Sequence, residues 1–316
     1  MTENDEKLYP LVSCIVTCYQ KIPLLYEAID SVLVQDYASL ELLVTDDGSK
    51  DFPSEQINAY IDGKKGRNVK RYYVIHNDEN VGTVRNIRRA LNCASGQFCI
   101  NLDGDDAFHH NTVISEIVSY MNENDLDFIG TGKIKCDDQL NGIETLPSEE
   151  ERSAISRMNT PRKQLHSFAV FQFFNIASGS GMAYRRDRVQ ELGLFDESFR
   201  NWQDGPSLVS YVKRGYLFVC NPSIVATKYR DGGVSNSPEN NQDAFVHISE
   251  DRKRFIERVT IPDRWNPHVF RRRSILFRYY WDVSKTNWGR IKAFLRYPEQ
   301  GIKMRIRKHK RIFRKK

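Results

Sequence analysis

Three carboxylates lie within four residues of one another, at Asp103, Asp105 and Asp106 in the segment DGDD. Coulomb repulsion makes such a cluster unfavourable unless a cation neutralises it. Because the candidate ligands are all oxygens, the cluster favours Mg²⁺ or Mn²⁺ over zinc, and such ions are commonly held by one or two carboxylates together with substrate phosphates. The alternative is a solvated acidic turn. We expect a metal site and a substrate that carries phosphate.

A second acidic pair, Asp46-Asp47, follows the apolar run at residues 40–45, just as the first cluster follows the run at residues 98–102. Open α/β sheets bind their ligands beyond the carboxyl ends of the strands. Two acidic clusters at two such ends therefore favour the metal site over the solvated turn.

The elements that must position these carboxylates alternate between strand and helix patterns. Short apolar, β-branched runs without a helical stripe predict strands buried on both faces, as in parallel sheets. Apolar residues at helical spacing lie between them, beginning with a helix whose first turn carries Pro23. The expected strands are residues 11–18, 40–45, 69–76, 98–102 and a short one near 128–129, and the expected helices carry Leu25 to Leu33, Val84 to Leu91 and Val113 to Met121. The alternation predicts an α/β fold with a mixed, mostly parallel sheet flanked by helices, and the polar residues 137–165 are expected to form a surface excursion or a mobile loop.

Composition limits the class of protein. The chain has 316 residues, of which 40% are hydrophobic and 28% charged, so most of it must fold around a core. Six cysteines without a CxxC pair argue against a disulfide scaffold or a zinc ribbon. The polar, acidic start MTENDEKLYP does not resemble a signal peptide, and no apolar run approaches a membrane span. A cytoplasmic location is expected.

Charge divides the chain into two parts. Residues 264–316 carry a net charge of +16, whereas the rest of the chain carries −10. We therefore expect a molecule of two parts, an acidic body and a basic tail.

Four ordered motifs within about residues 11–235 resemble family 2 glycosyltransferases of the GT-A (Rossmann-like) fold. The opening segment resembles the first strand, helix and DDGS strand of that family, and residues 80–86, NVGTVRN, resemble its NxGxxxN segment. Residues 96–108, GQFCINLDGDDAF, resemble its metal-binding strand end, and residues 178–216 resemble its acceptor-side block. The resemblance implies an inverting transferase that uses a nucleotide sugar. From its reach we expect residues 1–235 to form the GT-A catalytic domain and residues 236–316 to form a basic, largely helical extension.

The resemblance also implies roles for residues near the nucleotide. Asp47 would accept the hydrogen bond from uracil N3, and Asp46 would support the ribose or its own loop. Thr17 and Tyr19, just past the first strand, would border the base, although a Tyr here can equally be a packing residue. Asn80 belongs to the matched NxGxxxN segment and is included in the binding site.

Other matched residues would lie near the metal and the diphosphate. Asp105 would be the direct metal ligand, and Asp103 would lie near the ribose and the metal, whereas Asp106 is as well explained by a supporting position behind the ligands. Arg85 could contact the diphosphate or could belong to a solvated helix face. Arg230 matches a segment in which a basic residue reaches the diphosphate.

Inverting sugar transfer also requires a general base to take the acceptor proton. Asp204 is the candidate, although it follows Gln203 where the family usually has Glu. The competing interpretation is that Asp204 caps the helix that begins near Pro206. The QxxRW signature of processive members is absent, which favours the transfer of one sugar per encounter.

The expected function is an inverting transfer of one sugar from a nucleotide sugar, with a UDP-sugar favoured, to a hydroxyl of a glycan or lipid-linked saccharide during surface polysaccharide synthesis, with Mn²⁺ or Mg²⁺ as cofactor. One alternative is a metal-dependent nucleotidyltransferase, but no Gly-rich phosphate loop follows the first strand. A nucleic-acid-binding protein is the other alternative; the basic extension suggests it, but the acidic body opposes it, and no nucleic-acid partner is expected.

The basic extension combines cationic and aromatic residues at helical spacing, from Arg271–Arg273 through Trp281 and Trp288 to residues 303–316. Basic amphipathic helices bind anionic membrane surfaces, where each Lys or Arg contributes about 1 kcal/mol. We therefore expect residues 264–316 to lie on the inner face of the cell membrane, with a packed helical appendage as the alternative.

Overall fold

The computed structural model of the chain describes residues 9–176, 179–230, 242–283 and 286–304. Its centre is one sheet with the strand order β3-β2-β1-β4-β8-β6-β9-β5, and β7 pairs with β6 outside this path. The neighbours from β3 to β4 are parallel, as are β6 and β9, whereas the pairs made by β5, β7 and β8 are antiparallel. The strands are β1 (Val12–Cys18), β2 (Leu40–Asp46), β3 (Val69–His76), β4 (Phe98–Asp103), β5 (Ala107–Phe108), β6 (Phe128–Cys136), β7 (Gly142–Leu146), β8 (Ala183–Arg185) and β9 (Val219–Arg230). This sheet confirms the expected mixed, mostly parallel α/β fold.

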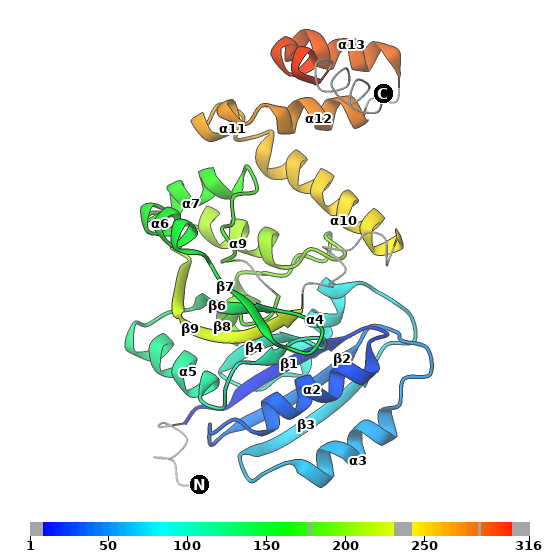
Figure 1. Cartoon of the computed structure of the whole chain (residues 1–316), viewed down its shortest axis with the longest axis vertical. Coiled ribbons are helices and arrows are strands. Elements are labelled where there is room, and N and C mark those ends of the chain that lie inside the picture. Colours follow the sequence, from blue (N-terminus) through cyan, green and yellow to red (C-terminus); the bar gives the residue numbers. More distant parts are fainter. Residues whose placement is uncertain (1–8, 177–178, 231–241, 284–285, 305–316) are drawn as a thin grey trace.

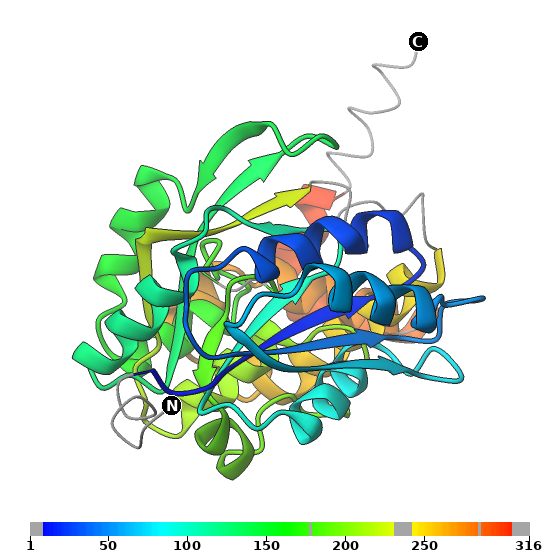
Figure 2. The ribbon, with the colours of Figure 1, turned by 90° about the horizontal axis from the view of Figure 1, so that it is seen from below.

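Helices cover both faces of the sheet (Figures 1 and 2). Those of the main body are α2 (Ile22–Leu33), α3 (Ser54–Lys64), α4 (Thr83–Cys93), α5 (Val113–Glu123), α6 (Glu149–Arg157), α7 (Pro161–Phe168), α8 (Arg186–Glu191) and α9 (Asp204–Lys213). The C-terminal segment adds α10 (Gln242–Phe255), the π-helical turn η1 (Ile256–Thr260), α11 (Pro267–Arg271), α12 (Ser274–Val283) and α13 (Asn287–Arg296). The sequence patterns predicted α2, α4 and α5 but not α3, which buries only Ile57 and Ile61.

Each strand of the parallel part contributes to two cores because successive side chains point to opposite faces. On β1, Cys14 and Val16 pack with α2, α3 and α5, whereas Ile15 packs with α4 and α9 on the other face. This arrangement explains the continuous apolar runs: a strand that is covered on both faces has no solvent-facing side.

Residues 137–165 lie largely at the surface, as one of the two expectations had it, but they are not the mobile loop of the other. They form β7, α6 and most of α7, and β7 pairs with β6. Ser148 and Glu151 form a capping box at the start of α6, and Thr160 caps α7 ahead of Pro161. Local capping therefore stabilises helices that bury few residues of their own.

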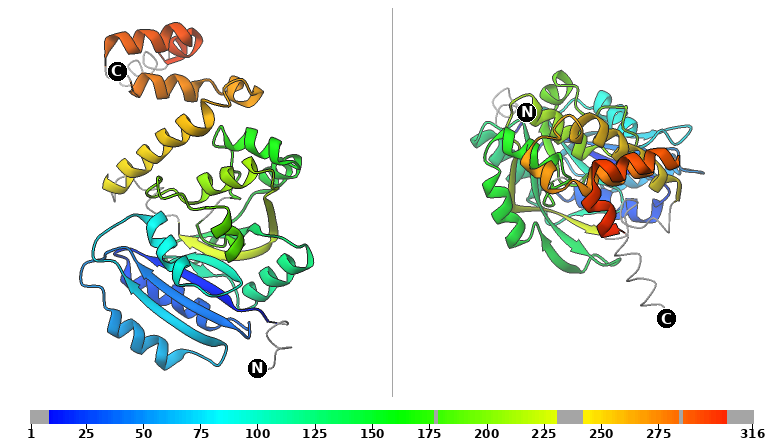
Figure 3. Two further views of the ribbon diagram at one scale, coloured as in Figure 1. Left: turned by 180° about the vertical axis from the view of Figure 1, so that it is seen from behind. Right: turned by 90° about the horizontal axis from the view of Figure 1, so that it is seen from above.

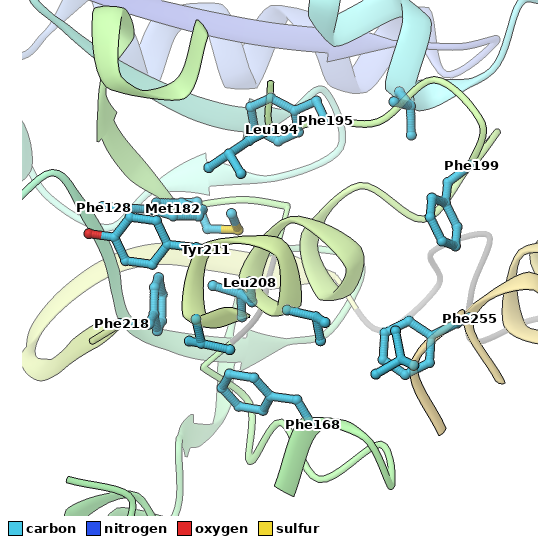
Figure 4. Packing of buried hydrophobic residues seen from close by; sticks show 14 of the residues in the cluster. Phe128, Phe168, Met182, Leu194, Phe195, Phe199, Leu208, Tyr211, Phe218 and Phe255 are labelled. Atoms are coloured by element: carbon cyan, nitrogen blue, oxygen red, sulfur yellow. The ribbon is translucent and has the colours of Figure 1, made fainter. Parts of the chain in front are cut away.

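The C-terminal helices rise away from the sheet at one end of the molecule (Figures 1 and 3). They continue the second core: Phe255, Val259 and Phe277 are buried in the same cluster as α7 and α9. Figure 4 shows Phe168, Leu208 and Phe218 around α9, with Phe255 reaching in from α10. Within the described residues, no helix combines the length and the apolar character that crossing a bilayer would require.

Candidate active site

Three polar side chains form a row where β2, β1 and β4 end. The register pairs Cys18 with Asp46 across β1 and β2, and Thr17 with Asp103 across β1 and β4. Thr17 Oγ1 donates a hydrogen bond to Asp103 Oδ1 at 3.1 Å. Two of the predicted carboxylates are therefore on adjacent sides of one strand, at the edge of the sheet where α/β proteins bind ligands.

The DGDD segment folds into a tight turn that concentrates negative charge. Burial and the nearby Asp105 carboxylate raise the pKa of Asp103 to about 6. Burial and the Asp103 and Asp105 carboxylates also raise the pKa of Asp106. Ser180 Oγ accepts the N–H of Asp103 and donates to Asp106 Oδ2, at 2.9 and 2.5 Å. Asp106 therefore supports the turn from behind and is itself buried.

A cation already lies on the predicted metal ligand. Lys21 Nζ contacts Asp105 Oδ2 at 2.6 Å, and both side chains are partly exposed. The lysine extends from the residue that precedes α2, directly after β1. Its ammonium group neutralises the Asp105 carboxylate, as a bound divalent ion would.

The backbone at Gly179 packs so closely against Asp103 that no side chain would fit at residue 179. A Cβ at Gly179 would lie 2.7 Å from Asp103 Oδ2 and equally close to Gln203 Nε2. Among the described residues, no group of three His, Cys, Asp or Glu side chains converges as a metal site. The carboxylates of Asp103 and Asp105 fit Mg²⁺ or Mn²⁺, because these ions take few protein carboxylates and complete their coordination with phosphate and water.

The first residue of the DDGS motif stabilises its own loop. Asp46 is buried, and its carboxylate accepts hydrogen bonds from Ser49 N and Ser49 Oγ at 2.7 and 2.5 Å. His76 Nδ1 lies 2.9 Å from Asp46 Oδ2. Ser49 Oγ also accepts the N–H of Gln20, which joins this loop to the one after β1. Asp46 was expected to support either the ribose or its own loop. These contacts favour the second role.

Asp47 binds the turn that precedes α4. Its carboxylate accepts the N–H groups of Val81 at 2.8 Å and Gly82 at 3.0 Å. Burial raises the pKa of Asp47, and these two hydrogen bonds oppose that rise. Asn80, in the same turn, accepts two hydrogen bonds from Arg200 Nη2, at 2.8 and 2.7 Å. Asp47 is thus close to Asn80, as expected from the motifs.

The predicted basic residues occupy different surroundings. The guanidinium of Arg230 is buried: Nη2 contacts Glu27 Oε2 at 2.6 Å, Nε donates to Asp138 O at 3.0 Å, and Nη1 donates to Asp105 O. Arg230 therefore joins α2 and the turn between β6 and β7 to the DGDD turn. Arg85 is exposed and lies 3.6 Å from Glu197, on the outer face of α4. Its surroundings fit the solvated face better than the diphosphate.

Tyr19 lies in the loop after β1 and is partly exposed. Its hydroxyl accepts a hydrogen bond from Gln20 Nε2 at 3.0 Å. Gln20 has φ of 62°, a left-handed conformation that sharply redirects the chain between β1 and α2. Tyr19 therefore lies in the loop that the Gln20 N–H joins to Ser49 in the DDGS loop.

Asp204 is the first residue of α9, and Gln203 occupies the N-cap position without a capping hydrogen bond from its side chain. The carboxylate of Asp204 accepts the N–H of Gly205 at 2.7 Å. Burial raises the pKa of Asp204, against the opposing effects of the Gly205 N–H, the Lys133 ammonium and a hydrogen bond from Trp202. A partly buried carboxylate with a raised pKa suits a proton acceptor.

Lys133 and Lys21 are site residues that the sequence analysis missed. Lys133 is buried on β6; burial lowers its pKa, while the carboxylates of Asp204, Asp106 and Asp103 oppose that effect. Its ammonium group lies 5.0 Å from the centre of the Tyr229 ring. The positive charge of Lys133 therefore interacts with the carboxylates of the DGDD turn and with that of the candidate base, Asp204. Only the placement of Lys21 after the first strand could have been noticed in the sequence.

The structure thus brings Thr17, Asp103 and Asp105 together, and couples Asp204 to them electrostatically through Lys133. Asp47 and Asn80 form an adjacent group, which Asp46 supports through the loop. Arg230 contacts the backbone of the DGDD turn, and Arg85 lies on the surface.

Comparisons with known proteins find relatives that are described as glycosyltransferases. One relative is an uncharacterized glycosyltransferase of Haemophilus influenzae, 33% identical over 116 residues, or 37% of this chain and 34% of that protein. The chain spans about a fifth of the length of two Rickettsia relatives, which are also described as uncharacterized glycosyltransferases.

Two solved structures share the fold. TarS residues 1–349 from S. aureus, in complex with UDP-GlcNAc, has a TM-score of 0.53 at 14% identity, covering 86% of this chain and 80% of that one. The mannosyltransferase PcManGT from Pyrobaculum calidifontis, in complex with GDP-Man and Mn²⁺, has a TM-score of 0.55 at 16% identity, covering 90% and 73%. At these identities the likeness shows the fold alone, and it confirms the GT-A class.

The family model described as glycosyl transferase family 2 matches residues 13–193, which include the DDGS loop, the NxGxxxN segment and the DGDD turn. Because this match spans more than half of the sequence, the chain belongs to glycosyl transferase family 2.

Proposed function

We propose that this protein is an inverting, metal-dependent glycosyltransferase that moves one sugar from a UDP-sugar to a hydroxyl of a glycan or lipid-linked saccharide during surface polysaccharide synthesis. The observation that carries the proposal is the grouping of Asp47, Asp103 and Asp105 at one edge of the sheet, with Asp204 at the start of a helix beside them. Nucleotide, metal and acceptor would meet at this edge.

Thr17, Tyr19, Asp47 and Asn80 would hold the nucleotide. Asp47 already accepts two backbone hydrogen bonds, and a carboxylate has about four lone-pair sites. It therefore retains the capacity to accept one more hydrogen bond, from the N–H of a uracil base. Asp46 and Arg230 would act indirectly, by holding the DDGS loop and the DGDD turn in place.

Asp105, assisted by Asp103, would hold a divalent ion of the Mn²⁺ or Mg²⁺ type. Bound there, the ion supplies charge neutralisation for the departing nucleoside diphosphate. Lys21 would leave Asp105 when the ion binds. Since its ammonium group starts 2.6 Å from the ligand oxygen, a small rotation of the side chain would direct it toward the diphosphate.

Asp204 would take the proton of the acceptor hydroxyl as that oxygen attacks the anomeric carbon from the side opposite the leaving diphosphate. One bond forms as the other breaks, so the configuration inverts. The raised pKa of Asp204 makes the carboxylate a stronger proton acceptor than a solvated aspartate.

The donor is the least determined part of the proposal. A structural neighbour was solved with UDP-GlcNAc and another with GDP-Man and Mn²⁺. Nucleotide release should therefore be measured with UDP- and GDP-sugars in the presence of Mn²⁺. We expect release from a UDP-sugar, inhibited by EDTA. Release only from GDP-sugars would reject the UDP assignment, and activity that survives EDTA would reject the metal.

The C-terminal helices support a peripheral membrane location on the cytoplasmic side, where a lipid-linked acceptor would be available. Trp265 and Trp288 are 81% and 70% exposed, and Leu295 is 71% exposed. Arg264, Arg290 and Lys292 lie beside these apolar side chains in the sequence. Aromatic and cationic side chains on one segment suit an anionic lipid surface. Residues 305–316, which carry much of the basic charge, lie outside the described part.

Co-sedimentation with vesicles tests this location. The full chain should bind vesicles that contain anionic lipid more strongly than neutral ones, and added salt should weaken the binding. A Trp265→Ala/Trp288→Ala variant should bind less, whereas Ile143→Ala, which alters an exposed apolar residue on β7, should bind as the unmodified chain does. Equal binding to both kinds of vesicle would reject the membrane location and leave the catalytic proposal intact.

A further inference from the structure

A buried carboxylate from the C-terminal segment accepts hydrogen bonds from three consecutive backbone amides in the loop before α9. This residue, Asp251 on α10, is 0% exposed. Its Oδ1 accepts the N–H of Arg200 at 2.9 Å, and its Oδ2 accepts those of Asn201 and Trp202 at 2.7 and 3.0 Å. Successive amides directed at one point form an anion-binding concavity. Here the chain's own carboxylate fills it, so Asp251 fixes the path of residues 200–202.

On one side, this loop leads directly to the candidate base. Asp204 follows two residues after Trp202, whose side chain donates a hydrogen bond to the Asp204 carboxylate. The Trp202 ring stacks on Phe171 with the ring centres 5.7 Å apart and lies 4.8 Å from the ring of Phe255. Phe255 is the last residue of α10. The same helix therefore holds both the backbone and the ring of Trp202.

On the other side, the loop packs against the turn of residues 80–82, which was assigned above to nucleotide binding. Arg200 donates from Nη2 to Asn80 O and Oδ1, and its own carbonyl accepts the N–H of Val84 at 3.0 Å. A Cβ at Gly82 would lie 2.7 Å from Arg200 O, so the two segments are in close contact. Gly82 also donates its N–H to Asp47. Movement of residues 200–202 would therefore disturb the turn on which Asp47 depends.

We infer that Asp251 is a positioning residue for sugar transfer, which holds the loop at residues 200–202 so that Asp204 and the turn of residues 80–82 keep their places. The inference rests on the proposed function, because it takes Asp204 as the base. It also assigns α10 to the catalytic unit, although the expected domain boundary after residue 235 placed α10 in the extension.

Asp251→Asn tests the inference, because it preserves size while replacing one acceptor oxygen with an NH₂ group that cannot accept the amides. Glu250→Gln is the matched control, an exposed neutral substitution on the same helix. Three quantities are measured for each protein: hydrogen exchange of the peptide that contains residues 200–202, the stoichiometry and affinity of UDP binding with Mn²⁺, and the rate of UDP-sugar hydrolysis per UDP-binding site.

We expect Asp251→Asn to exchange at least about 10-fold faster at residues 200–202 and to lower kcat per binding site by at least about 10-fold, with Glu250→Gln unchanged on both measures. The rate per binding site matters because a merely structural role would reduce the number of competent sites and leave the rate of each unaltered. A rate per site within twofold of the unmodified enzyme would overturn the inference.

If Asp251→Asn does not fold, Arg200→Ala decides the question, because it removes the contact with Asn80 and keeps the three backbone amides. It should weaken UDP binding several-fold while residues 201 and 202 remain protected; unchanged UDP affinity would overturn the inference. The two proposals can also be separated. Full activity of Asp204→Asn beside a slow Asp251→Asn would reject Asp204 as the base and retain the positioning role, whereas the reverse pattern would reject the positioning role alone.

Discussion

At the scale of single residues, the site is organised by carboxylates that differ in what surrounds them. Asp46 and Asp106 have their oxygens engaged by neighbouring loop atoms, whereas Asp105 faces a lysine that can move away. Sequence position alone does not separate these roles, since the three carboxylates belong to two similar acidic clusters. The hydrogen-bond partners of these carboxylates separate their roles, because an oxygen that already accepts hydrogen bonds from the protein is less available to a ligand.

Asp105→Ala should abolish sugar transfer and remove the dependence of UDP binding on Mn²⁺, because the direct metal ligand is lost. The fold should persist, as the Asp105 side chain is partly exposed. Calorimetric titration with UDP, with and without Mn²⁺, measures this, and Asp187→Ala on the exposed face of α8 is the control. Turnover close to that of the unmodified enzyme would remove Asp105 from the metal site.

Asp204→Asn should lower kcat by at least about 10²-fold, the lower end for the loss of a general base, and leave donor affinity nearly unchanged. Because the pKa of Asp204 is raised, kcat of the unmodified enzyme should rise with pH through a value above the ordinary 3.8 of aspartate, as the base becomes deprotonated. Asp204→Asn should lack this rise of kcat with pH, and the control Asp187→Asn should keep it. Weaker donor binding at unchanged kcat would instead indicate a binding role.

Lys21→Met should bind Mn²⁺ alone about tenfold more tightly, because the competing ammonium group is removed from Asp105. A unit charge pair at 4 Å is worth about 1 kcal/mol in water, and a divalent ion doubles the repulsion that is relieved. Calorimetry or the Mn²⁺ paramagnetic resonance signal reports the affinity without any substrate. Lys70→Met, on an exposed part of β3, should match the unmodified protein, and equal affinity in all three proteins would contradict the competition.

At the scale of elements, two tight turns hold the site between the sheet and the helices. Gly82 begins α4 with φ of 93°, and its missing side chain admits the backbone of Arg200. Gly82→Ala should destabilise the protein by about 2–4 kcal/mol, combining left-handed strain with overpacking. Urea unfolding measures this loss.

Gly63→Ala is the matched control for that prediction, because Gly63 lies inside α3 with nothing within 4 Å of an added Cβ. It should stabilise the protein by about 0.5–1 kcal/mol, as alanine is the better helix former. Similar unfolding midpoints for the two variants would show that the turn at Gly82 is not as constrained as its contacts indicate.

At the scale of the whole molecule, the role inferred for Asp251 extends the catalytic unit beyond the boundary expected near residue 235, toward the change in charge at residue 264. A chain that ends at Pro262 keeps α10 and η1 and should still bind UDP with Mn²⁺, with a lower melting temperature because it loses the buried contacts of Val269 and Phe277. A chain that ends at residue 241 loses Asp251 and Phe255 and should not bind. Melting curves with and without UDP and Mn²⁺ distinguish the two, and equal binding by both chains would restore the boundary near residue 235.

The sequence determined the alternation of elements and the positions of the acidic clusters. Both depend on local pattern: apolar runs and helical spacing predicted β1 to β4 and the core helices, and motif spacing placed Asp47, Asp103 and Asp105 at strand ends. For residues 137–165 the mobile-loop alternative was wrong, because their helices depend on caps such as Ser148 with Glu151, and a polar composition hides such caps.

Only the tertiary structure decided which side chains meet across long separations. Arg230 is 203 residues from Glu27, its partner, and Asp251 is 51 residues from Arg200. Lys133 is flanked by carboxylates from two other parts of the chain. No local periodicity encodes such pairs, because each depends on the folded path of two segments that are independent in the sequence. The elements follow from short-range backbone and hydrophobic preferences, whereas the charges that tune the site follow from the packing of those elements.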